Sequence, residues 1–264
     1  MSHYMKNENE LFLHKSGLTA FKTCRLRFKY MYITNLRMDR APELDRGTLF
    51  HDAAYKFVHM IDADVLFGHT TWPDRFSYLK TCISEPDDLT YEVRELMYNL
   101  AEMESKRSMG WKSPKSWFKP IWLEKYLETR VPSKYAGTLD RLDHYDDEHL
   151  IVGDYKSGGL HNISQMRQEM LVYAMIINNL PIVEELGKHV AYWCTIHPRG
   201  DLKEYIVEPF KAATFKALER NTAKIWVAID EDDFPHKVGE HCDWCPFLWK
   251  CWTEEWYWDE VKNE

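Results

Sequence analysis

The sequence has no long hydrophobic run, because no apolar stretch approaches the roughly 18 residues that a membrane-spanning helix needs. Its opening residues also lack the apolar core of a secretory signal peptide. Positive charge is in deficit, since 34 Lys and Arg stand against 42 Asp and Glu, for a formal charge of −8. These absences argue against a membrane protein and against a protein that coats nucleic acid by bulk charge. We expect a cytoplasmic protein that holds any polyanion locally.

Cysteine is also scarce, with six among 264 residues, and the 11 glycines and 11 prolines are scattered. Without a secretory signal, so few cysteines indicate thiols or metal ligands rather than a disulfide framework. No linker or internal repeat divides the chain, and no G-x-x-x-x-G-K-[ST] loop supplies a nucleotide-hydrolysing motor. Since 45% of the residues are apolar and 14% aromatic, we predict a single domain over residues 1–264 with a substantial core.

Hydrophobic periodicity predicts a mixed α/β domain. Three parts are expected, namely a mainly helical part, a catalytic α/β core and a cysteine-cluster segment, at residues 1–130, 131–228 and 229–264. The first part should contain a helix capped by Ser16, a helix from near Arg46 and a helix over 87–107. The expected elements of the core are a β-hairpin at 134–156, a helix around 166–177, strands at 189–196 and 204–208, and a helix over 210–227.

The hairpin carries a candidate metal site. With the turn centred on its acidic triplet, Leu142 lies opposite Val152, and Asp140 lies opposite Asp154. Two carboxylates about 5 Å apart repel each other unless a cation lies between them, and Mg²⁺ prefers oxygen ligands. Lys156 leaves the same face as Asp154, so we expect its pKa to be lowered near the cation, where it would help remove a proton from the attacking water.

The alternative is a solvated hairpin with ordinary polar residues, because an Asp-x-Lys triplet often arises by chance. His51 favours the metal site. It lies within residues 47–55 on a predicted helix, with Tyr55 on the same face, and a neutral imidazole can complete a metal shell. Taken alone, one helical histidine among 12 is more simply a surface or core residue.

A second metal site is predicted at four distant cysteines. Cys242, Cys245 and Cys251 have the spacing C-x2-C-x5-C, and Cys24 is the best candidate for a fourth ligand. Four thiolates can hold an iron–sulfur cluster, and a structural zinc site that uses a nearby histidine is the competing interpretation. Either would join the two ends of the domain, with a stabilisation on the order of 5 kcal/mol by analogy with a long disulfide loop. Four aromatic residues are expected to shield the cluster from water: Trp244, Phe247, Trp249 and Trp252.

Together these motifs resemble the RecB-like nucleases of the PD-(D/E)XK superfamily. Within that group they are similar to the iron–sulfur branch, which includes AddB-type nuclease domains and CRISPR-adaptation exonucleases. The resemblance rests on five segments in the same order, at residues 16–30, 47–55, 137–143, 153–158 and 242–251. It implies a restriction-endonuclease-like mixed sheet flanked by helices, with an N-terminal helical region and a 4Fe–4S cluster, or Zn²⁺ in its place.

The resemblance also implies roles for individual residues. By it, His51, Asp140 and Asp154 bind Mg²⁺ or Mn²⁺, the Tyr155 carbonyl is a further ligand, and Lys156 acts on the attacking water. The implied activity is that of a metal-dependent DNA nuclease, an exonuclease that leaves a 5′-phosphate and a 3′-hydroxyl in recombination, repair or replication. The alternative is a non-catalytic nucleic-acid-binding or assembly subunit with the same fold.

One position departs from the family pattern. The family usually has a Gln four residues before a helical Tyr, whereas Glu169 holds that place before Tyr173 and Gln168 precedes it. One helical step rotates a side chain by about 100°, so the sequence leaves open which of the two residues takes the family's role. Tyr173 is either a catalytic residue or a core residue of an amphipathic helix.

Residues 22–46 hold seven basic residues and three acids, a local balance of +4. We expect contacts to phosphates here, with Phe28 and Tyr30 stacking on bases, although a solvated helix face is an equally simple interpretation. The expected partner is DNA that is single-stranded or has free ends, without sequence-specific readout. The acidic segments at 230–233 and 252–264 are expected to face solvent or a protein partner. The expected DNA-binding residues are Arg25, Arg27, Lys29 and Arg46.

Overall fold

The computed structural model describes residues 10–36, 42–84, 87–158, 163–199 and 204–253. Its centre is a mixed sheet with the strand order β1-β2-β3-β4-β5. The first three strands are antiparallel, β4 runs parallel to β3, and β5 is antiparallel to β4. The strands are β1 (Trp122–Thr129), β2 (Tyr135–His144), β3 (His149–Tyr155), β4 (His189–His197) and β5 (Glu204–Pro209).

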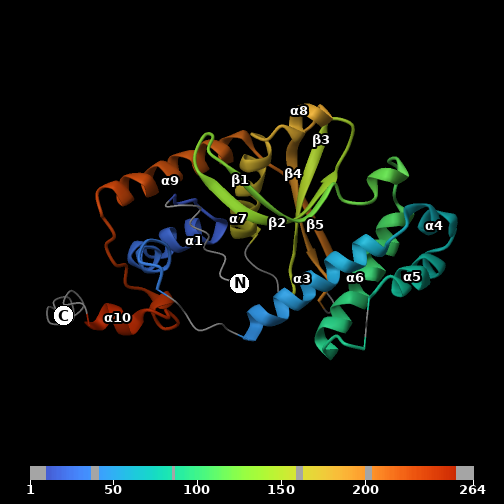
Figure 1. Cartoon of the computed structure of the whole chain (residues 1–264), viewed down its shortest axis with the longest axis horizontal. Helices are drawn as coiled ribbons and strands as arrows, with labels where there is room; N and C mark the ends of the chain where they lie inside the picture. Colours follow the sequence, from blue (N-terminus) through green and yellow to red (C-terminus); the bar gives the residue numbers. More distant parts are fainter. Residues whose placement is uncertain (1–9, 37–41, 85–86, 159–162, 200–203, 254–264) are drawn as a thin grey trace.

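Helices cover both faces of this sheet (Figure 1). On one face lies α7 (Ile163–Ile177), which contacts α1 (Lys15–Thr23) and α9 (Ala212–Asp230). The other side holds α3 (Pro42–Met60) and α6 (Tyr91–Met109). The remaining short helices are α2 (Arg25–Phe28), η1 (Lys29–Ile33), α4 (Ala63–Gly68), α5 (Trp72–Thr81), η2 (Lys115–Trp117), α8 (Ile182–Leu186), η4 (Glu240–Cys242) and α10 (Leu248–Thr253). The expected mixed sheet flanked by helices is confirmed.

Helices cover both faces of the sheet. Because successive side chains along a strand point to opposite faces, each strand contributes to both of the cores beneath these helices. On β3, Val152 joins the core under α7, which includes Met170 and Trp193. Its neighbour Ile151 joins the core under α6, which includes Met97. A strand that is covered twice needs a continuous apolar run rather than an alternating one, and this explains the run that begins at residue 150.

The register of the predicted hairpin is confirmed where it is apolar, since Leu142 pairs with Val152. The ladder ends, however, at Arg141 and Gly153, so the expected direct pairing of Asp140 with Asp154 does not form. Beyond this point the Tyr155 N–H donates to Asp140 Oδ2 at 2.7 Å. On its other edge β3 stays paired with β4 through Asp154 and Tyr155, whereas on the β2 edge a side chain takes the place of the next backbone partner.

Three expectations for the first part of the chain are wrong in detail. Ser16 does not cap a helix: α1 begins at Lys15, and the Ser16 hydroxyl accepts a hydrogen bond from Tyr32 at 2.8 Å. The second helix begins at residue 42 rather than near Arg46. The strand β1 was not expected within residues 1–130, because its sequence WLEKYLET holds one β-branched residue and lies at the sheet edge, where alternation is weak.

The helix predicted from a recurring apolar face is α7. All five of the residues that define that face are buried: Met166, Met170, Tyr173, Ala174 and Ile177. The sequence predicts that the two cysteines outside the cluster, Cys82 and Cys194, are buried thiols, and both are buried. Among the described helices, none has the length and hydropathy needed to cross a lipid bilayer.

Candidate metal centre and cysteine pocket

Three potential metal ligands converge from elements that are distant in the sequence. His51 comes from α3, Glu124 from β1 and Asp140 from β2, and their ligand atoms all lie within 4.8 Å of one another. His51 Nδ1 lies 3.0 Å from Glu124 Oε1 and 3.6 Å from Asp140 Oδ1. One imidazole and two carboxylates in this arrangement form a donor set suited to Mg²⁺ or Mn²⁺.

Glu124 is a site residue that the sequence interpretation missed. It lies opposite Asp140 between two regular β1–β2 pairs, Leu123 with Arg141 and Lys125 with Leu139. Its φ of 45° is in the left-handed region, which a residue with a side chain enters at a cost on the order of 1–3 kcal/mol. A strained residue facing a buried carboxylate indicates a functional position, but only the paired strands bring Glu124 there.

Removing the Glu124 carboxylate should weaken metal binding. For Glu124→Gln we expect at least a tenfold loss of Mn²⁺ affinity, because one of the charged ligands is replaced by a neutral amide. Isothermal titration calorimetry measures this directly. Glu128→Gln is the matched control, because Glu128 lies on the same strand and contacts Arg130 at 3.2 Å. Equal affinity in Glu124→Gln and in the wild type would remove Glu124 from the site.

Asp154 lies outside this group of three and between two lysines. Lys15 Nζ is 2.8 Å from its Oδ1, and Lys156 Nζ is 2.7 Å from its Oδ2. Burial acts to raise the pKa of Asp154, but the two ammonium groups outweigh it and hold that pKa below its usual range. The pKa of Asp140 shifts the other way, because burial and the nearby Asp154 charge both raise it. A bound cation would relieve this repulsion, so the residues fit a divalent metal.

The Lys156 ammonium lies between two carboxylates of this site. Besides Asp154, it contacts Glu169 Oε2 at 3.3 Å. Burial disfavours its ammonium, but the two carboxylates outweigh burial and raise the Lys156 pKa, whereas the sequence led us to expect a lowered pKa. Glu169, which is half-buried, therefore faces the site, while Gln168 is exposed to solvent.

Tyr173 lies under the strand that carries Asp140. Its hydroxyl donates to the Thr138 carbonyl at 2.5 Å, and Lys15 Nζ lies 5.4 Å from the centre of its ring. A Cβ at Gly137 would come within 3.0 Å of this ring, so the close approach requires glycine. Tyr173 is buried and supports β2 as a core residue.

Tyr155 has its side chain on the opposite side from Asp154. Its hydroxyl accepts a hydrogen bond from Arg141 Nη1 at 2.9 Å, while its backbone N–H orients Asp140. The two residues that follow the site carboxylates, Arg141 and Tyr155, are therefore joined beneath them. This contact holds β2 and β3 together where their ladder has ended.

All four predicted cluster cysteines line one cavity of about 30 Å³, although Cys24 is more than 200 positions from the others. None of the four forms a disulfide. No three of the described cysteine and histidine ligand atoms in this cavity lie within 4.8 Å of one another. We call this set, formed by Cys24, Cys242, Cys245 and Cys251, the cysteine pocket. Its donors are all sulfur, which suits zinc or an iron–sulfur cluster.

The aromatic shield around this pocket is mostly absent among the described residues. Phe247 is buried and lines the cavity, as expected. Trp244, Trp249 and Trp252 are instead exposed, at 73%, 62% and 45% of their surface. The expectation for these three tryptophans is wrong, because α10 and the turn before it present them to solvent rather than to the cysteines.

The basic residues of the first helices are largely paired with acids. Arg25 contacts Asp233 at 2.7 Å and Lys29 contacts Asp232 at 2.8 Å. The acidic segment at 230–233 thus meets these helices rather than only solvent. Arg27 lines the cysteine pocket, and Arg46 lies apart on α3 and contacts Glu92 at 3.2 Å.

The expected stacking of Phe28 and Tyr30 on bases is wrong. Phe28 is fully buried against Tyr32 and Phe234, with ring centres 5.1 and 6.2 Å apart. Tyr30 is buried against Phe247. These rings close the core beneath the first helices and have no face open to a ligand. Most of the acidic segment at 252–264 lies outside the described residues.

The family model described as the PD-(D/E)XK nuclease superfamily matches residues 15–252, a span that includes the metal centre and the cysteine pocket. The chain is also similar to a solved structure from Eubacterium rectale named “Putative exonuclease”, with 11% sequence identity and a TM-score of 0.49 over 92% of this chain and 90% of that chain. The comparison with curated proteins found no match.

Proposed function

The chain belongs to the PD-(D/E)XK nuclease superfamily, and from this premise we propose that it is a metal-dependent DNA exonuclease of the RecB-like, iron–sulfur branch. One observation carries the proposal: the ligand atoms of His51, Glu124 and Asp140 converge beside the Asp154–Lys156 ion pair. The products would be a 5′-phosphate and a 3′-hydroxyl, made during recombination, repair or replication.

His51, Glu124 and Asp140 would hold Mg²⁺ or Mn²⁺, with Asp154 and the Tyr155 carbonyl as further ligands. The bound ion supplies Lewis-acid stabilisation of the phosphate and lowers the pKa of water. Among the protein groups, Asp140 is already oriented by the Tyr155 N–H. Its position is therefore set before any metal arrives, which lowers the cost of assembling the site.

Lys156 would position the attacking water. Its ammonium lies between Asp154 and Glu169 and so is oriented on two sides. From there it can donate a hydrogen bond to the water or to a phosphate oxygen, where negative charge develops during in-line attack. Glu169 would take the place of the family's Gln. Tyr173 would act by supporting β2 rather than by touching substrate.

Lys15 is a further residue of this site, and the sequence interpretation did not single it out. Its contact to Asp154 Oδ1 leaves that carboxylate flanked by ammonium groups on both oxygens. We propose that Lys15 is a positioning residue, which holds Asp154 in the orientation that presents Lys156 to the phosphate. The Lys15 ammonium competes with a metal ion for the Asp154 carboxylate, so its loss should lower the rate of catalysis without lowering metal affinity.

Replacing Lys15 with methionine should therefore separate the effect on catalysis from the effect on metal binding. In Lys15→Met we expect kcat for DNA cleavage to fall by about tenfold, the usual cost of losing a partner that orients a site residue, with no loss of Mn²⁺ affinity. Lys22→Met is the control, because Lys22 is an exposed lysine of the same helix. An unchanged kcat, or a parallel loss of metal affinity, would contradict a positioning role.

An iron–sulfur cluster is our proposal for the cysteine pocket. In a tetrahedral zinc site with Zn–S bonds of about 2.3 Å, the sulfur atoms lie about 3.8 Å apart. The cysteines here are more widely spaced than that, because no three of their sulfur atoms lie within 4.8 Å of one another. The resemblance to the iron–sulfur branch favours the cluster, and metal analysis distinguishes iron from zinc.

Digestion of end-labelled DNA tests the proposed activity. With Mg²⁺ or Mn²⁺ we expect linear DNA, single-stranded or with free ends, to be shortened from its termini, while circular DNA of the same sequence stays intact. Chelation with EDTA should stop the reaction. Cutting of circles would contradict the exonuclease assignment. DNA binding without hydrolysis under either metal would favour the non-catalytic subunit instead.

A further inference from the structure

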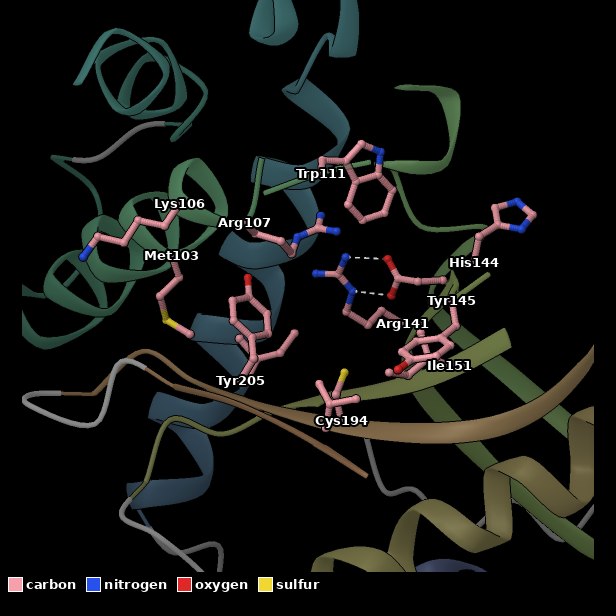
Figure 2. Close-up of a pocket in the computed structure, with 13 residues that line it drawn as sticks. Met103, Lys106, Arg107, Trp111, Arg141, His144, Tyr145, Ile151, Cys194 and Tyr205 are labelled. Carbon is pink, nitrogen blue, oxygen red and sulfur yellow. Dashed lines mark hydrogen bonds and ion pairs between the residues drawn. The ribbon is translucent and has the colours of Figure 1, made fainter. Parts of the chain in front are cut away.

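Guanidinium groups that are taken out of water on the α6 side of the sheet are paired with acids. The Arg141 side chain forms two hydrogen bonds to Asp143, at 2.7 and 2.6 Å, which are the dashed lines in Figure 2. Arg107 Nε lies 2.7 Å from a Glu104 oxygen. Such pairing is expected, because a charge removed from water is costly unless it meets an opposite charge or hydrogen-bond acceptors. Arg27, at the cysteine pocket, departs from this pattern.

Arg27 has a buried donor without a partner. Its Nε is covered from solvent and forms no hydrogen bond with any described residue. The Nε atoms of Arg46 and Arg94 share this property, but other nitrogens of these two guanidinium groups contact Glu92 at 3.2 Å and Asp87 at 3.6 Å. Of the three arginines, Arg27 is therefore the one that lacks an opposite charge in the part of the chain that the structure describes.

The basic residues next to Arg27 on the first helices do have acidic partners. Arg25 contacts Asp233 at 2.7 Å, and Lys29 contacts Asp232 at 2.8 Å. Arg25 and Lys29 are four residues apart and so share one helical face. Arg27 lies two residues from Arg25, about 200° around the helix, and its side chain lines the cysteine pocket. Two cations of this segment thus meet the acids at 230–233, and the third meets the cysteines.

The cysteine pocket requires a cationic donor once it is loaded. Four thiolates carry more negative charge than a divalent ion neutralises, so the metal group is an anion, and it lies beside the buried ring of Phe247. His241, which also lines the pocket, already donates its Nε2–H to the Lys237 carbonyl at 2.8 Å. The Arg27 guanidinium stays charged in proteins. Burial raises the pKa of the Cys245 thiol, and the Arg27 charge acts against this rise.

We propose that Arg27 is a positioning residue for the metal group of the cysteine pocket, an inference that rests on the proposed iron–sulfur cluster. Its Nε–H donates a hydrogen bond to a sulfur of the loaded pocket, and its charge offsets the negative charge of the group. One electron from an external reductant adds negative charge to a cluster, and hydrogen bonds to the sulfurs favour this reduced form. Arg27 therefore raises the reduction potential of the cluster.

A redox titration of the full chain tests this inference. Anaerobically purified protein is reduced stepwise with dithionite and followed by electron paramagnetic resonance, without DNA or Mg²⁺. In Arg27→Met we expect the one-electron equilibrium to shift about tenfold toward the oxidised cluster, which lowers the midpoint potential by about 59 mV. Arg25→Met is the matched control, because it removes the same charge from the same helix while Arg25 does not line the pocket. It should keep the wild-type potential.

Arg27→Lys separates the hydrogen bond from the charge. Lysine keeps the positive charge but has no donor at the Nε position, so its potential should fall between those of wild type and Arg27→Met. This variant also supplies the measurement if Arg27→Met does not hold the cluster. A wild-type potential in both Arg27 variants, or an equal shift in Arg25→Met, would overturn the proposal. A wild type that holds zinc alone would overturn it too.

The potential is measured apart from nuclease activity, so the two proposals fail separately. If the potential shifts as expected but DNA is not cleaved, the nuclease proposal fails and the role of Arg27 stands. If Arg27→Met instead weakens binding of single-stranded DNA and leaves the potential unchanged, Arg27 contacts DNA, as the basic segment at 22–46 led us to expect. The proposed role at the cysteine pocket then fails.

Discussion

Replacing Asp140 with asparagine is expected to lower the rate of Mg²⁺-dependent DNA cleavage by on the order of a thousandfold. Asp140 is the carboxylate shared by the whole site, since it lies beside His51 and Glu124 and repels Asp154. Asparagine keeps an oxygen that can accept the Tyr155 N–H, so the strands should stay in place while the negative charge is lost.

Single-turnover cleavage of end-labelled DNA at saturating Mn²⁺ measures this effect. Asp147→Asn is the matched control, because Asp147 is an exposed acid in the turn of the same hairpin, and it should cleave at the wild-type rate. Circular dichroism should show the same melting transition for both variants. If Asp140→Asn cleaves within a few fold of wild type, the metal centre is not where DNA is hydrolysed.

Replacing Cys24 with serine should both remove the cluster and destabilise the protein. Cys24 is buried at the start of α2, while the other three ligands lie in the segment around η4 and α10. A cluster across this pocket joins the two ends of the described chain. By analogy with a long disulfide loop, its loss should lower the free energy of unfolding by on the order of 5 kcal/mol.

Anaerobic purification, iron and zinc analysis and urea unfolding test this prediction together. Wild-type protein should be brown and contain iron, whereas Cys24→Ser should be colourless and unfold at lower urea. Cys82→Ser is the control, because Cys82 is a buried thiol outside the cysteine pocket, so the variant should keep its colour. A colourless wild type that contains only zinc would refute the iron–sulfur cluster but not the metal link between the two ends of the described chain. Unchanged iron content and stability in Cys24→Ser would refute both Cys24 as a ligand and the metal link between the chain ends.

The hairpin could be predicted because its evidence is local. Leu142 and Val152 are apolar residues on facing strands, and a shift of one residue would move one of them to the opposite face of the sheet from its partner. That register also brings Asp140 near Asp154. The prediction failed one residue further on, where the β2–β3 ladder ends while β3 stays paired with β4. No residue pattern within the hairpin records where its ladder ends.

Charge pairing across the molecule was beyond sequence reasoning. Arg25 and Lys29 looked free for phosphate, but Asp233 and Asp232 reach them across more than 200 positions. Lys15 similarly meets Asp154 across 139 positions. An ion pair of this kind depends on how helices dock, and docking is governed by the apolar faces rather than by the charges themselves.

The sequence alone determined the mixed α/β fold, because alternating and helical periodicities are local properties of a chain. It also placed His51, Asp140, Asp154 and the four cysteines in the motifs of a nuclease family. Only the tertiary structure decided that Glu124 completes the metal group and that the aromatic residues of the first helices are buried. The physical reason is that ligand geometry depends on distances between elements, and these are set by packing that no single segment contains.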